Sequence, residues 1–154
     1  MADTDRRNLP LFAYGTLMFP TVIQSVIGRV PTSRPATIAG YCRFEVTGES
    51  FPGLVERDGT SIEGLLYFDL GKDEWERLTA FEDDFYNLEE VAVSSAQETV
   101  HALAYIVPAA RKAVLSEKAW DPEDFRKNHL VPFSRSGSPD GASRDRDSAK
   151  IEPG

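Results

Sequence analysis

Glu82 is the residue whose position in the sequence most strongly suggests chemistry. A helix is predicted over residues 71–85, and Glu82 falls within its apolar arc when successive residues are placed about 100° apart. The arc consists of Trp75, Leu78, Phe81 and Phe85. An ionised carboxylate on a buried face costs free energy unless it is paired or hydrogen-bonded, and the other solution is a raised pKa. Such a carboxyl group can take up and return a proton near neutral pH, so Glu82 is predicted to be a general acid–base.

A second interpretation of Glu82 is structural: the side chain lies at the edge of the arc and reaches water. A carboxylate near a helix C-terminus is nevertheless disfavoured by the helix dipole, so stability does not explain its position. Glu74 differs, because it stands in the first turn, where the dipole favours a carboxylate. Asp83 and Asp84 are predicted to point toward solvent.

The loop Tyr14-Gly15-Thr16-Leu17 is the second candidate feature. It follows an apolar strand and precedes a helix that starts near Pro20, so several backbone N–H groups come together there. Such a loop can hold a carboxylate or a developing oxyanion. An ordinary connection between strand and helix is the alternative interpretation.

Nucleophilic and metal chemistry have little support in the residue types. The single cysteine, Cys42, lies in an apolar run and is interpreted as a small buried hydrophobe. The two histidines, His101 and His129, are far from it in sequence and show no ligand spacing with it. We therefore predict neither a metal site nor a cofactor.

The elements that must position Glu82 and the loop alternate irregularly along the chain. Strands are predicted over residues 9–14, 36–46, 61–70, 86–95 and 100–107, and helices over residues 20–27, over residues 71–85 and within residues 120–133. A turn is expected over residues 51–54, followed by a short strand and a hairpin at Asp58-Gly59, and a second hairpin is expected across residues 96–99.

This order predicts an α+β fold with a small mixed sheet or open barrel and about three short helices, because no regular strand–helix alternation indicates a doubly wound sheet. The predicted domain covers residues 9–133. Residues 134–154 are rich in Ser, Gly, Pro, Asp and Arg, and they are predicted to be a disordered tail.

Composition narrows the class of function. The chain has 154 residues and a net charge of −8, and an acidic surface repels phosphate backbones, so no nucleic-acid partner is expected. No apolar stretch approaches the roughly 18 residues of a membrane span, and the polar first eight residues lack the core of a signal peptide. These observations predict a cytoplasmic protein without a membrane partner. They leave its oligomeric state open.

The two candidate features together resemble the gamma-glutamylcyclotransferase-like superfamily. Its Tyr-Gly-Ser/Thr-Leu loop is similar to residues 14–17, and its Leu-Asp-x-x-Glu type helical segment is similar to residues 78–82. Further similarities are Tyr86 before a strand, the Pro52-Gly53-Leu54 turn and the strand at residues 63–67. Trp120, Phe125 and His129 resemble the plant and fungal avirulence-induced branch. This sequence departs from the common pattern at Ala80, Asp83 and Leu88.

The resemblance implies cleavage of a gamma-glutamyl amide by the substrate's own alpha-amine, which releases 5-oxoproline and a free amine. It implies Glu82 as the proton-transfer residue, with Tyr14, Gly15, Thr16, Leu17 and Tyr86 around the small-molecule substrate. Two alternatives remain open. One is an inactive domain of the same fold that binds a small ligand, and the other is an interaction protein whose tail, with its Ser136-Gly137-Ser138-Pro139 stretch, is the working part.

Overall fold

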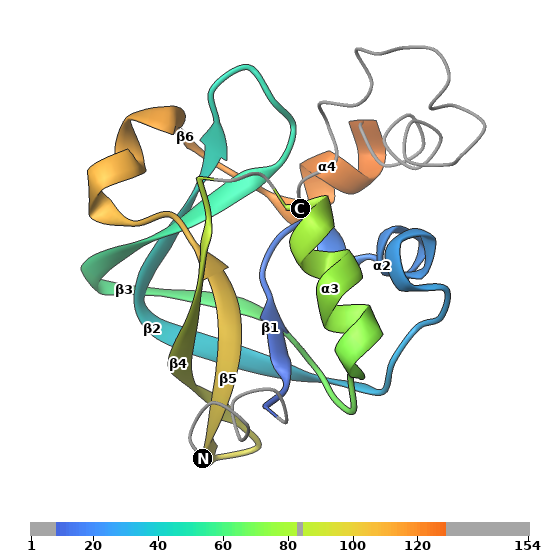
Figure 1. Ribbon diagram of the computed structural model, residues 1–154. Coiled ribbons are helices and arrows are strands. Elements are labelled where there is room, and N and C mark those ends of the chain that lie inside the picture. The colour runs from blue at the N-terminus through green and yellow to red at the C-terminus, as the bar shows by residue number, and fades with distance from the viewer. Residues whose placement is uncertain (1–8, 83–84, 129–154) are drawn as a thin grey trace, which may run out of the picture.

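A long antiparallel hairpin forms the frame of the structure. The computed structural model describes residues 9–82 and 85–128, and in it β2 (Ser33–Val46) pairs with β3 (Pro52–Tyr67) along almost the full length of both strands. Strands β1, β5 and β4 bridge the two arms of this hairpin, so the sheet curls into a barrel (Figure 1).

The strand order is β3-β1-β5-β4-β2-β6, and the additional pairing of β3 with β2 closes the first five strands into a ring. The shorter members are β1 (Leu11–Ala13), β4 (Asn87–Ser95), β5 (Glu98–Ile106) and β6 (Leu115–Ala119). β1 pairs in parallel with β5, whereas the other pairings are antiparallel. The predicted α+β fold with a mixed sheet is confirmed, and the structure adds the closure.

Three α-helices lie on one side of the barrel (Figure 1). They are α2 (Pro20–Ile27), α3 (Lys72–Phe81) and α4 (Pro122–Asn128), and short 3-10 helices span Thr16–Met18 (η1) and Ala109–Val114 (η2). α2 begins with Pro20 in its first turn and ends at Gly28, whose φ of 89° is the left-handed conformation that glycine adopts at low cost. The predicted helix over residues 20–27 is confirmed.

β1 separates the two hydrophobic clusters of the protein because successive side chains of a strand point to opposite faces. Phe12 and Tyr14 pack with residues of the other strands inside the barrel, including Ile38 and Leu66. Leu11 and Ala13 face the helices and pack in the second cluster. That cluster includes Leu17, Val22, Ile23, Trp75, Leu78, Trp120 and Phe125. The loop that follows β1 therefore starts at the boundary between barrel and helices.

α3 is shorter than predicted, and this changes the position of Glu82. The helix ends at Phe81, and Glu82 caps it with an extended backbone (φ −81°, ψ 149°). Its N–H still donates to the carbonyl of Leu78 at 3.2 Å, so Glu82 completes the last turn without continuing the helix. A run of carboxylates at a helix C-terminus opposes the dipole, which favours an early end. Asp83 and Asp84 lie outside the described residues.

The predicted turn over residues 51–54 and the hairpin at Asp58-Gly59 are both wrong. β3 runs continuously from Pro52 to Tyr67, and the turn of the hairpin lies at residues 47–51. The register between β2 and β3 shifts after Ala39, so residues near Gly59, whose φ is 87°, form a bulge within one strand. An Asp-Gly pair supplies the positive φ for a bulge as readily as for a turn, so the local signal does not distinguish them.

The structure confirms one further predicted hairpin and the last predicted helix, and it contains two elements that were not predicted. The hairpin between β4 and β5 is confirmed, and Ala96 and Gln97 form its turn with φ values of 52° and 66°. β6 and η2 are absent from the prediction because the β6 sequence is short and mostly polar and shows no alternation. The helix predicted within residues 120–133 is present as α4, and its expected continuation beyond Asn128, like the predicted tail, lies outside the described residues.

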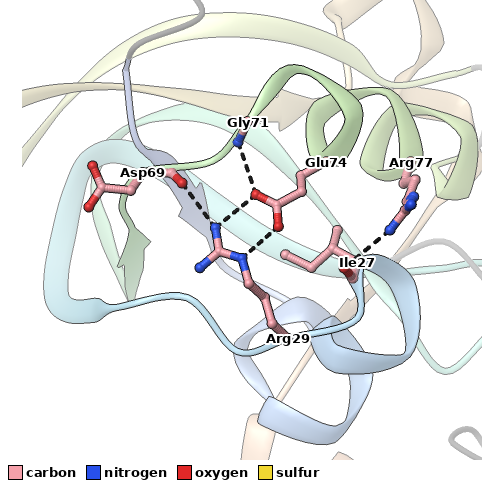
Figure 2. Close-up of polar contacts among 6 residues, drawn as sticks. All are labelled: Ile27, Arg29, Asp69, Gly71, Glu74 and Arg77. Carbon is pink, nitrogen blue, oxygen red and sulfur yellow. Dashed lines mark hydrogen bonds and ion pairs between the residues drawn. The ribbon is translucent and has the colours of Figure 1, made fainter.

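A bidentate ion pair fixes the start of α3 against the end of α2 (Figure 2). Arg29 donates to the two carboxylate oxygens of Glu74 at 2.6 and 2.8 Å and to the carbonyl of Asp69 at 2.9 Å. Glu74 also accepts the backbone N–H of Gly71 at 2.9 Å. At the other side of the contact, Arg77 donates to the carbonyl of Ile27 at 3.3 Å. These contacts set the axis of α3 and thereby the place where Glu82 ends it.

Candidate functional site

Glu82 lies at the end of α3 with its carboxyl group inside the protein. The residue as a whole is only partly buried, but both carboxylate oxygens are shielded from solvent. Leu78, one turn earlier on α3, is fully buried, so the last turn of the helix is held against the core. Solvent cannot screen a carboxylate in such surroundings, and its effect on neighbouring groups is correspondingly large.

Three buried tyrosines surround this region. The hydroxyl of Tyr14 donates to the backbone carbonyl of Tyr105 at 2.6 Å, and the hydroxyl of Tyr86 donates to the carbonyl of Pro52 at 2.7 Å. Each hydroxyl has a single proton. The donors of Tyr14 and Tyr86 are therefore used by the protein, and both residues hold strands in place.

The hydroxyl of Tyr105 meets the hydroxyl of a threonine. Its oxygen lies 2.9 Å from Oγ1 of Thr79, and either group can be the donor. Thr79 stands on α3, one turn before Glu82.

Electrostatics place Glu82 near two of these hydroxyls. Burial raises the pKa of Tyr14 well above its usual value, and the negative charge of Glu82 raises it further. Burial also raises the pKa of Tyr105. The hydrogen bond with Thr79 lowers this pKa in part, and the negative charge of Glu82 raises it further. Both tyrosines stay protonated near neutral pH, which makes them neutral hydrogen-bonding groups.

The loop Tyr14-Gly15-Thr16-Leu17 is buried along its whole length. The carbonyl of Leu17 accepts the hydroxyl of Tyr67 at 2.7 Å, and burial raises the pKa of that tyrosine to about 12. The side chain of Thr16 is 0% exposed, and its hydroxyl has no hydrogen-bond partner within the described ranges. Of the predicted site residues, Glu82 acts on Tyr14 through its charge, and Tyr86 forms a side-chain hydrogen bond with Tyr14. Gly15, Thr16 and Leu17 follow Tyr14 in the buried loop.

Arg43 of β2 belongs to the same region and was not foreseen from the sequence. Its Nη1 donates to the carbonyl of Tyr14 at 2.7 Å and to that of Glu63 at 3.3 Å. The guanidinium lies 5.2 Å from the centre of the Trp120 ring. Phe125 packs on Trp120 at 5.7 Å and on Phe19 at 5.3 Å, so the C-terminal aromatic residues cover the arginine and the end of the loop.

Sequence reasoning missed Arg43, Tyr105 and Thr79. A cation within the apolar run around Cys42 was a usable signal for Arg43, because a charge in such a run needs an explanation. Tyr105 and Thr79 carried no signal, since each is an ordinary residue of a strand or a helix. Cys42 itself is partly buried and lies next to Arg43 on β2.

Two surface cavities in the described part of the chain are remote from this chemistry. Surface cavities of about 570 and 340 Å³ lie near η2 and near the turn after β4, and neither includes Glu82 or the loop. Residues 9–82 and 85–128 contain no group of three His, Cys, Asp or Glu side chains that could hold a metal ion. No helix in these ranges has the length and apolar character to cross a membrane.

Sequence comparison finds relatives in Arabidopsis thaliana. The chain is 28% identical to AIG2-like protein D over 126 residues, which cover 80% of this chain and 82% of that protein. It is 32% identical to AIG2-like protein A over 126 residues, which cover 80% and 75% of the two chains.

Comparison of structures gives the same fold. An Arabidopsis thaliana protein solved in solution superposes with a TM-score of 0.63 at 25% identity, over 81% of this chain and 85% of that one. A yeast gamma-glutamyl cyclotransferase specific to glutathione superposes with a TM-score of 0.56 at 14% identity, over 72% and 73% of the two chains.

The family described as gamma-glutamyl cyclotransferase, AIG2-like, matches residues 11–124, which run from the first residue of β1 into α4 and include the loop, Arg43 and Glu82. With this match over most of its length, and with the fold and relatives described above, the chain belongs to the gamma-glutamyl cyclotransferase, AIG2-like family.

Proposed function

We propose that this protein is a gamma-glutamylcyclotransferase that cleaves a gamma-glutamyl amide and releases 5-oxoproline and a free amine. The observation that carries the proposal is the position of Glu82. Its two oxygens are shielded from water, and its charge acts on the hydroxyl of Tyr14, the first residue of the loop. A base and a set of backbone donors are the two components that this reaction requires from a protein.

The nucleophile and the leaving group both come from the substrate. The alpha-amine nitrogen attacks the gamma-carbonyl carbon, a C–N bond forms, and the electron pair of the carbonyl moves to its oxygen. When the carbonyl re-forms, the bond to the leaving amine breaks. Closure of a five-membered ring brings the reacting atoms together within one molecule, so neither a nucleophilic side chain nor a cofactor is needed.

Proton transfer is the task of Glu82 in this proposal. An alpha-amine has a pKa of about 7.7–8.0 in model peptides and is largely protonated at neutral pH. Glu82 accepts the proton that the amine loses and returns it to the leaving amine. The tyrosines do not compete as bases, because the pKa values of Tyr14 and Tyr105 are raised.

The N–H groups of Gly15, Thr16 and Leu17 hold the negative charge of the substrate or of the tetrahedral intermediate. Tyr14 and Tyr86 hold the strands around the loop in position. Their hydroxyls donate hydrogen bonds to backbone carbonyls of β5 and of the start of β3. The substrate class is a gamma-glutamyl amide, and the amine that leaves is for experiment to identify.

The test is a screen for 5-oxoproline release from glutathione, gamma-glutamyl dipeptides and gamma-glutamyl-lysine. We expect wild-type protein to turn over at least one of them and Glu82→Gln to lose about 10²-fold or more of that activity. The control is Glu76→Gln, which removes an exposed carboxylate of the same helix and leaves activity unchanged.

Two results would overturn the proposal. Full activity of Glu82→Gln would remove its catalytic role. Failure of the wild type to release 5-oxoproline from any compound, together with a raised Tm in the presence of one of them, would make the protein a binding domain of this fold. The predicted tail is tested in the same assay, because deletion of residues 134–154 is expected to leave turnover intact.

A further inference from the structure

Arg43 is the only Lys or Arg of the described ranges whose side chain is not exposed. Burial lowers the pKa of its guanidinium, although Asp121, Tyr14 and Glu63 act in the opposite sense. No ion pair of the described residues includes Arg43, and its buried Nε has no hydrogen-bond partner among them. Arg43 is partly buried, and the groups that hold its guanidinium are backbone carbonyls and the Trp120 ring.

The strongest contact of Arg43 is with the peptide that opens the loop. Its Nη1 donates to the Tyr14 carbonyl at 2.7 Å, and the bond between Tyr14 and Gly15 is trans. In a trans peptide the C=O and the N–H point in opposite directions. The Gly15 N–H therefore points away from Arg43, toward the opposite edge of the peptide plane.

A cation on the carbonyl strengthens the N–H of the same peptide. The guanidinium draws electron density toward the oxygen, and hydrogen bonds that share one polar unit reinforce each other where the dielectric constant is low. Beside this peptide the hydroxyl of Thr16 is fully buried and has no partner among the described residues. It is therefore a second polar group in the loop that could bind the substrate. The Trp120 ring, 5.2 Å from the guanidinium, prevents Arg43 from swinging away.

We propose that Arg43 is a positioning residue that orients and polarises the Tyr14–Gly15 peptide, so that the Gly15 N–H stabilises the oxyanion formed on the gamma-carbonyl oxygen. This inference rests on the proposed function and adds to it the source of positive potential at the loop. A donor held rigidly before the reaction acts on charge that develops in the transition state, so its main effect is on kcat. Arg43 acts through the peptide and need not touch the substrate.

The experiment compares Arg43→Met, Arg43→Lys and the control Arg34→Met. Arg34 suits this purpose because it also lies on β2 and over an aromatic ring, at 5.1 Å from the centre of Phe68, but it is exposed. We expect Arg43→Met to lower kcat roughly tenfold with KM within twofold of wild type, since removing an entire oxyanion donor costs about 10²–10³. Arg43→Lys, which keeps the charge, is expected to recover part of kcat, and Arg34→Met to leave it unchanged.

A second readout does not depend on turnover. The amide proton of Gly15 is expected to shift upfield in the NMR spectrum of Arg43→Met, because a less polarised N–H is more shielded, and to stay in place in Arg34→Met. If the wild type turns over no gamma-glutamyl amide, the proposed function fails, and the Gly15 resonance still reports whether Arg43 polarises the peptide.

Three outcomes would overturn the inference. An unchanged Gly15 resonance in a folded Arg43→Met variant would show that the peptide is not polarised. An increase of KM with kcat unchanged would place the Gly15 N–H on a ground-state carboxylate and not on the oxyanion. Equal kcat losses in Arg43→Lys and Arg43→Met at equal Tm would show that the positive charge is not what matters.

Discussion

The hydroxyl of Tyr14 donates a 2.6 Å hydrogen bond to the backbone carbonyl of Tyr105, which joins the end of β1 to β5. Both residues are buried, with 3% and 5% of their surface exposed. Tyr14 is also the first residue of the loop, so one side chain fixes the position of the loop relative to the barrel.

Tyr14→Phe is predicted to destabilise the protein by about 1–3 kcal/mol, because a buried polar group is then left without its partner. Thermal or denaturant unfolding measures the change. Tyr41→Phe is the matched control: this tyrosine of β2 is only partly buried, and its loss of a hydroxyl is expected to cost less than about 0.5 kcal/mol. Equal losses in the two variants would contradict the structural role of the Tyr14 hydroxyl.

Tyr105→Phe tests the hydroxyl that faces Thr79. We expect kcat for 5-oxoproline release to fall by about three- to tenfold, because the charge of Glu82 acts on this hydroxyl and the variant removes a neutral polar group from its surroundings. Thr79→Val removes the partner of Tyr105 and should produce part of the same loss. If both variants keep wild-type kcat, the pair of hydroxyls has only a packing role.

The ion pair between Arg29 and Glu74 predicts how stability depends on pH. The hydrogen bonds from Arg29 lower the pKa of Glu74 from 4.5 to about 2, with burial acting weakly in the opposite sense. A carboxyl group with a depressed pKa in the folded state stabilises the protein above its unfolded pKa, and that contribution is lost as the pH falls from 4.5 toward about 2. Because Arg29 is 45% exposed, solvent and salt screen the pair, and we expect only about 0.2–1 kcal/mol.

Chemical denaturation of wild type and Glu74→Gln between pH 6 and pH 2.5, at about 0.05 M and 0.5 M salt, checks this prediction. The difference between the two proteins is expected to shrink toward acid pH and at high salt. A difference that stays constant over this range would show that Glu74 stabilises α3 by some means other than its charge.

Gly64 is predicted to be intolerant of even one methyl group. A Cβ at this position of β3 would collide with the backbone oxygen of Ala13 and lie 2.8 Å from the ring of Phe12. Gly64→Ala is therefore expected to cost about 1–3 kcal/mol or more, because neither a strand backbone nor a fully buried ring can move aside easily. A Cβ at Gly71 would meet nothing closer than 3.9 Å, so Gly71→Ala is the control and should unfold like wild type.

Several parts of the fold were open to prediction because their signals are local. The helix over residues 20–27 follows from an amphipathic pattern between Pro20 and Gly28, and the β4–β5 hairpin follows from two apolar runs around a short polar turn. Glu82 was found in a similar way, from a charge within an apolar arc. That argument assumed a helix through Phe85, whereas α3 ends at Phe81 and Glu82 caps it.

The sequence alone singled out the candidate residues: one carboxylate among apolar neighbours and a Gly-Thr loop after the first strand. Tertiary structure decided how they meet. The closure of the barrel by β2 and β3, and the approach of Arg43 and Tyr105 to the loop, depend on strand pairings between residues far apart in the chain. Such pairings are set by the packing of the whole sheet, and local patterns of residues do not record them.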